Sequence, residues 1–73
     1  MYLTEKEAWY KRMMDESYER YGIVSIEYKI DNGNRADIYN TNGQRILAGL
    51  TLENAYWAVM GITNFYLKMF PER

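Results

Sequence analysis

The chain has 73 residues, which suffice for one domain with a small core and not for two. Its content of 48% hydrophobic and 16% aromatic residues excludes a disordered chain, and the lack of cysteine excludes disulfide staples and thiolate metal sites. The net charge of −1, with basic residues spread along the chain, argues against a nucleic-acid-binding face and against a DNA mimic. The first twenty residues are charged and show no signal peptide, so we expect a cytoplasmic protein.

The first helix is predicted over residues 4–21. Thr4 followed by Glu7 has the spacing of a capping box, in which each side chain accepts a hydrogen bond from the other residue's backbone N–H. Gly22 supplies the C-terminal stop, because glycine adopts the left-handed conformation without strain. Apolar and aromatic side chains gather on one side of the helical wheel: Tyr10, Met13, Met14, Tyr18 and Tyr21.

Residues 23–50 predict a three-stranded antiparallel meander with strands at 23–31, 35–41 and 44–50. The first segment alternates, with apolar residues on one side: Val24, Ile26, Tyr28 and Ile30. The pair Asn-Gly occurs at 32–33 and again at 42–43, and between alternating segments it is a strong hairpin signal.

The parity of the strands predicts how the two hairpins align. A two-residue turn at 32–33 would set Ile30 opposite Arg35, an apolar residue against a charge. A three-residue loop with a bulge restores matched pairs, which are Ile30 with Ala36, Tyr28 with Ile38, and Lys29 with Asp37. We therefore predict that loop for the first hairpin. For the second hairpin we predict a two-residue turn that sets Ile38 opposite Leu47.

The last helix is predicted over residues 52–70. Thr51 is a suitable N-cap ahead of Leu52, and Pro71 ends the helix because the residue before a proline disfavours the helical conformation. The predicted fold class is therefore α+β, a single small α-β-β-β-α domain in which a three-stranded antiparallel meander packs with two helices.

Residue types needed for most catalysis are missing. The chain has no histidine and no cysteine, and so lacks the commonest general base, the commonest metal ligand and the best nucleophile. Residues 31–34 begin like a calcium loop, but Gly33 and Ala36 stand where an EF-hand needs an oxygen ligand and a glycine. We expect no catalytic residue, no cofactor, no metal and no small-molecule substrate, so an enzyme is the weakest hypothesis.

The element order is similar to that of the double-stranded RNA-binding domain, a resemblance that covers nearly the whole chain. That family carries a lysine cluster at the start of its second helix and a Gly-Pro-x-His loop in its first hairpin. This chain has Thr-Leu-Glu-Asn-Ala at 51–55 and Asp-Asn-Gly-Asn at 31–34 in those places. The resemblance therefore implies element order and does not imply RNA binding.

The last helix is more apolar than one sheet requires. About 220° of its wheel is apolar, whereas a helix packed on one sheet needs roughly 100° or a little more. Trp57 lies in the middle of the remaining polar arc, where it either anchors a partner or lies over Gly61 and covers the helix backbone. We expect an interface that includes Trp57, Met60 and Phe65, with Trp9 of the first helix as a weaker member. A membrane partner is not expected, because the apolar run at 55–62 is far shorter than the roughly twenty residues of a span.

A second candidate surface is the outer face of the sheet. The predicted registers direct Tyr39, Ile46 and Leu50 away from the face that carries Val24 and Ile38. A centre of apolar side chains with a charged rim is typical of partner sites. The alternative is that one helix covers each face of the sheet, in which case these residues belong to the core.

Three functional hypotheses follow. The first is a non-catalytic protein-binding module whose partner is another protein, a second copy of the chain, or both. Its small size and composition are typical of phage or mobile-element accessory proteins, many of which inhibit a host protein as anti-CRISPR proteins do, and on this analogy we expect such a role. The second is a nucleic-acid-binding or regulatory domain that stacks bases on Tyr39 and holds phosphates with Arg35 and Lys29. The third is an enzyme subunit.

Overall fold

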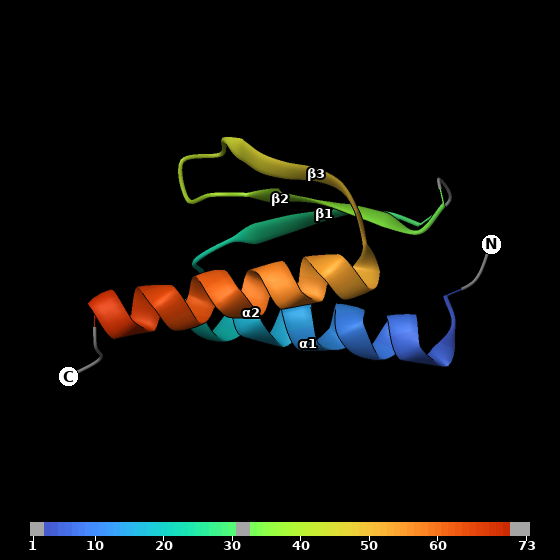
Figure 1. The fold of residues 1–73 in the computed structure, drawn as a ribbon, viewed down its shortest axis with the longest axis horizontal. Helices are drawn as coiled ribbons and strands as arrows, with labels where there is room; N and C mark the ends of the chain where they lie inside the picture. Colours follow the sequence, from blue (N-terminus) through green and yellow to red (C-terminus); the bar gives the residue numbers. More distant parts are fainter. Residues whose placement is uncertain (1–2, 31–32, 71–73) are drawn as a thin grey trace.

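The five secondary-structure elements follow one another in the predicted order in the computed structural model, which describes residues 3–30 and 33–70 (Figure 1). They are α1 (Glu5–Tyr21), β1 (Ser25–Lys29), β2 (Arg35–Tyr39), β3 (Arg45–Thr51) and α2 (Leu52–Met69). The strands form one antiparallel sheet in the order β1-β2-β3. The predicted α+β class and α-β-β-β-α order are confirmed.

Both ends of α1 are fixed by the capping residues that the sequence predicts. The N–H of Glu7 donates to Thr4 Oγ1 at 3.1 Å and the N–H of Thr4 donates to Glu7 Oε1 at 2.9 Å, so both bonds of the capping box are present. Gly22 has φ of 64° and its N–H donates to the carbonyl of Tyr18 at 2.8 Å, which ends the helix. The buried residues of α1 are Tyr10 and Met14.

Helix α2 begins directly at the end of β3. The N–H of Asn54 donates to Thr51 Oγ1 at 3.1 Å, which confirms Thr51 as the N-cap. The helix ends at Met69, and the N–H of Phe70 donates to the carbonyl of Tyr66. Pro71, predicted to end the helix, lies outside the described residues.

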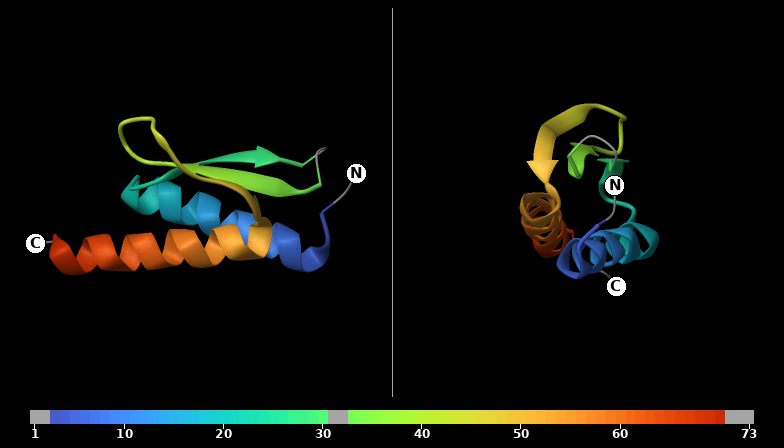
Figure 2. Two further views of the ribbon diagram at one scale, coloured as in Figure 1. Left: turned by 45° about the horizontal axis from the view of Figure 1, so that its top comes forward. Right: turned by 90° about the vertical axis from the view of Figure 1, so that its right-hand side faces the viewer.

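Both helices lie on the same face of the sheet, as the two views in Figure 2 show. The alternative in which one helix covers each face is therefore wrong. The two helices and the face of the sheet on which they lie enclose one core: Tyr10, Met14, Val24, Ala36, Ile38, Leu52, Ala55 and Val59. Tyr28 joins α1 to β1, because its hydroxyl donates to Asp15 Oδ1 at 2.8 Å. Burial, followed by this hydrogen bond, raises the pKa of Tyr28.

The first hairpin differs from the predicted register by two residues. Tyr28 lies opposite Ala36 and Ile26 opposite Ile38, so five residues, 30–34, separate β1 from β2. The predicted three-residue loop is wrong, and its Asn32 and the predicted strand end at Asp31 lie outside the described residues. The shift is an even number, so the side chains keep their predicted faces. Parity selects a face of the sheet, but it does not distinguish two registers that differ by two residues.

The second hairpin has a longer turn than predicted. The N–H of Gly43 donates to the carbonyl of Asn40 at 3.0 Å, and the N–H of Asn40 donates to the carbonyl of Gln44 at 2.9 Å. Gly43 has φ of 80°, so the connection is a three-residue loop that ends in a left-handed glycine, and not a two-residue turn. Asn40 stabilises it, because its Oδ1 accepts hydrogen bonds from two backbone N–H groups of the loop. The predicted pair of Ile38 with Leu47 is present.

A bulge in β3 changes the face of its last residues. Ile38 lies opposite Leu47 and Ala36 opposite Leu50, so the segment of β3 between the two pairs is one residue longer than the matching segment of β2. Gly49, in this bulge, has φ of 69°. The extra residue turns Leu50 toward the helices, where it packs against the core. The predicted outward position of Leu50 is therefore wrong.

Helix α2 extends beyond the sheet and beyond the end of α1 at its C-terminal end (Figure 1). Among the elements that the structure describes, none therefore covers the last turn of α2. Four large apolar side chains at this end are exposed: Phe65, Tyr66, Met69 and Phe70.

Candidate functional site

One row of side chains runs along the uncovered side of α2. We call it the α2 ridge, and it consists of residues spaced four apart: Glu53, Trp57, Gly61, Phe65 and Met69. All five are exposed, and residues at this spacing form the continuous ridges by which helices pack on one another. Trp57 is 59% exposed, Phe65 66% and Met69 59%. Three large apolar side chains thus lie in solvent on a single ridge.

Trp57 does not cover the backbone at Gly61. A Cβ placed on Gly61 would meet no side-chain atom within 4 Å, so the indole lies elsewhere. It packs against Tyr56, with ring centroids 5.0 Å apart and planes at 71°. Of the two interpretations of Trp57, the one in which it shields Gly61 is wrong, and the exposed indole is available for contact with a partner.

Gly61 forms a notch between the two aromatic residues of the ridge. A glycine in the interior of a helix costs about 0.5–1 kcal/mol of stability relative to alanine. No atom of the described residues lies within 4 Å of the position that a Cβ would take. The fold itself therefore gives no reason for a glycine here, whereas close approach of another backbone would give one. In the sequence, the signal for this feature is an isolated glycine, Gly61, within an apolar helical pattern.

Charge on α2 is confined to its two ends. Glu53 lies in the first turn and Lys68 in the last, and no residue between them is charged. Each charge suits the helix macrodipole, which favours acids at the N-terminal end and bases at the C-terminal end. The exposed face between them is therefore apolar and amide-bearing, with an acid at one end and a base at the other.

Trp9 extends the aromatic surface from α2 onto α1. Its ring centroid lies 5.5 Å from that of Tyr10 and 5.4 Å from that of Tyr56. Because Tyr56 also contacts Trp57, the two tryptophans are the ends of one aromatic chain. The two tryptophans, which come from different helices, therefore both contact the same residue, Tyr56. Phe65 lies two turns further along the α2 ridge.

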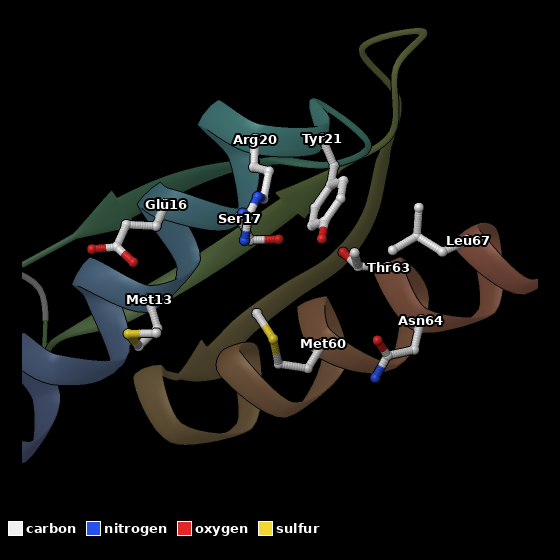
Figure 3. A pocket seen from close by; sticks show the side chains of 9 residues that line it. All are labelled: Met13, Glu16, Ser17, Arg20, Tyr21, Met60, Thr63, Asn64 and Leu67. Carbon is white, nitrogen blue, oxygen red and sulfur yellow. The ribbon is translucent and has the colours of Figure 1, made fainter. Parts of the chain in front are cut away.

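Met60 has a different position from the rest of the predicted interface. It is half-buried and lines a pocket of about 220 Å³ between α1 and α2 (Figure 3). The hydroxyls of Ser17, Tyr21 and Thr63 point into the same pocket in Figure 3. A drug-sized ligand needs a cleft of about 300–1,000 Å³, and this pocket is smaller.

The predicted patch on the outer face of the sheet is not assembled. Leu50 lies on the inner face, as described above, and Ile46 lies exposed on β3 where the register shifts. Tyr39 keeps its predicted place on the outer face, and its hydroxyl donates to Glu27 at 2.9 Å. This hydrogen bond is the main reason why the pKa of Tyr39 is raised above its ordinary value.

A buried carboxylate occupies the centre of that outer face instead. Asp37 is 1% exposed, and its Oδ1 accepts a hydrogen bond from the N–H of Gly49 at 2.9 Å. Its Oδ2 lies 3.0 Å from Lys29 Nζ and 3.6 Å from the guanidinium of Arg45. The backbone hydrogen bond, followed by the lysine, holds the pKa of Asp37 below its ordinary value. Lys29 is thus engaged by a carboxylate. The bulge in β3 that brings the Gly49 N–H to Asp37 had one signal in the sequence, a glycine within a predicted strand.

Comparisons with protein-family models, with curated proteins and with solved structures find no match to this chain. Among the residues that the structure describes, no group of three or more acidic side chains is placed to hold a metal ion. Within the same residues, neither helix is long and apolar enough to cross a membrane.

Proposed function

We propose that this chain is a non-catalytic protein-binding module that uses the α2 ridge. The observation that carries the proposal is the exposure of Trp57, Phe65 and Met69 on one ridge of one helix. Exposing large apolar side chains in a contiguous row is costly in water and is characteristic of interaction surfaces. Tryptophan is also the residue most enriched among the anchors of protein interfaces.

The geometry favours this surface over nucleic-acid binding by the sheet. On the outer face, Lys29 and Arg45 both lie beside the carboxylate of Asp37, which offsets one of their two positive charges. Tyr39 is tied to Glu27. A stacking platform needs a free aromatic face beside cations that can reach phosphates.

The wider biological role is proposed on size and composition. We propose that binding inhibits a host protein, as expected of a phage or mobile-element accessory protein. We propose the cytoplasm as its compartment, since a chain without cysteine gains nothing from an oxidising one.

Affinity capture from the native host tests the proposal. The tagged chain is compared with Trp57→Ala and Phe65→Ala, and with Tyr18→Ala, which removes an exposed aromatic from α1. We expect the two α2 variants to lose bound protein and the α1 control to keep it. Equal recovery by all four chains would show that the α2 ridge is not the binding surface.

A further inference from the structure

We infer that the partner of the α2 ridge is a second copy of the same chain, bound antiparallel about a two-fold axis at Gly61. This inference rests on the proposed function, since it assigns a second copy to the same surface when no host protein is bound. The dimer is weak and reversible, so a host protein that binds the α2 ridge displaces the second copy. It draws on three features of the α2 ridge: its symmetry, its charges and its area.

The α2 ridge is symmetric about its glycine. Trp57 lies one turn before Gly61 and Phe65 one turn after it, each about 6 Å away along the helix axis. In a two-fold pair, a residue before the axis on one copy contacts a residue after the axis on the other. Trp57 of each copy therefore meets Phe65 of the other, while the two glycines face one another. The missing Cβ allows the helix backbones to approach closely.

Charge selects the antiparallel orientation. Glu53 lies eight residues before Gly61 and Lys68 seven residues after it, which is about 12 Å and about 10 Å along the axis. By the same rule, an antiparallel pair brings Glu53 of each copy to the level of Met69 and the adjacent Lys68 of the other, where the long lysine side chain can reach the carboxylate at both ends of the contact. A parallel pair would bring acid beside acid and base beside base, which is unfavourable. The uncharged stretch between them presents no like charges to a second copy.

The area is sufficient for a weak, reversible dimer. Taking about 150–250 Å² for a whole large side chain, Trp57, Phe65 and Met69 together expose about 280–460 Å² per copy. Two copies would bury about 550–900 Å² from these side chains, which is just under the lower limit of ~1,000 Å² for a stable specific interface and within the range of weak, transient ones. We expect a dissociation constant of roughly 1–100 μM for a contact at this lower limit.

Sedimentation equilibrium of the full chain from about 1 μM to about 1 mM tests the inference. We expect the wild type to shift from monomer to dimer over this range, and Gly61→Leu to remain monomeric. Gly61 is exposed and a Cβ there meets no described atom within 4 Å, so we expect circular dichroism to show an intact helix content. A wild type that remains monomeric throughout, or a Gly61→Leu variant that still dimerises, would overturn the inference.

A charge exchange tests the orientation. Glu53→Lys places a cation beside Lys68 of the second copy and should weaken dimerisation roughly tenfold, as should Lys68→Glu. The double variant restores opposite charges and should recover the wild-type constant, although both changes oppose the helix macrodipole. Glu19→Lys, on an exposed part of α1, makes the same change in net charge and should have no effect. Failure of the double variant to recover would overturn the antiparallel arrangement.

The two proposals fail in distinguishable ways. A monomeric wild type whose capture of host protein still depends on Trp57 would end the dimer inference and leave the protein-binding proposal standing. Trp57→Ala and Phe65→Ala variants that change neither capture nor self-association would end both.

Discussion

Replacing Gly49 with alanine tests whether the bulge in β3 depends on the left-handed backbone. Gly49 has φ of 69°, and a Cβ at this position would meet nothing within 4 Å. The cost of Gly49→Ala is therefore conformational and not steric. A non-glycine residue in the left-handed region costs about 1–2 kcal/mol. For a domain of this size that loss lowers the melting temperature by about 4–16 °C.

The assay is thermal and urea unfolding, followed by circular dichroism. Gly49→Asn is the matched control, because asparagine tolerates the left-handed region better than alanine and should cost less. Gly61→Ala is the contrasting control. It also adds a Cβ to free space, but within a helix, and should stabilise the monomer by about 0.5–1 kcal/mol. A Gly49→Ala variant as stable as the wild type would refute this account of the bulge, as would a Gly49→Asn variant that loses as much.

Three further predictions concern the core and the titrating groups. Ile38→Val should lower the free energy of unfolding, measured by urea titration, by about 0.5–1.5 kcal/mol. The control Ile46→Val, at an exposed position of β3, should change it by less than about 0.5 kcal/mol. Equal losses in the two variants would contradict the place of Ile38 in the core. Asp37→Asn should destabilise the domain above pH 4. Because the pKa of Asp37 in the folded protein lies below its ordinary value of 3.8, its contribution to stability is lost as the pH falls below that value. The difference in the free energy of unfolding between wild type and Asp37→Asn should therefore become smaller in acid. A difference that stays unchanged down to pH 2 would contradict this. Tyr28→Phe should act in the opposite range. The pKa of Tyr28 is raised above its ordinary value of 10.0, so its contribution to the free energy of unfolding is present below pH 10 and is lost as the pH rises above that value. Urea unfolding from pH 8 to pH 11.5 should therefore show the difference in stability between wild type and Tyr28→Phe becoming smaller. A difference that stays constant over this range would show that Tyr28 titrates normally.

The sequence by itself determined the features that depend on neighbours along the chain. The capping box of Thr4 and Glu7, the stop at Gly22 and the N-cap at Thr51 all join residues no more than four apart, so their chemistry can be read locally. The faces of β1 and β2 follow from strand parity. Within the candidate site, the apolar excess of α2 and the unusual place of Trp57 were visible as pattern.

The tertiary structure alone decided how distant segments meet. It placed both helices on one face, and it set β1 against β2 two residues away from the predicted register, because parity is blind to an even shift. It also turned Leu50 into the core, since the bulge at Gly49 is held by Asp37 from the neighbouring strand, twelve residues away in the chain. The α2 ridge became a candidate site for the same reason: only the packing of α1 and the sheet on the other side of α2 determines which part of its apolar arc is left in solvent.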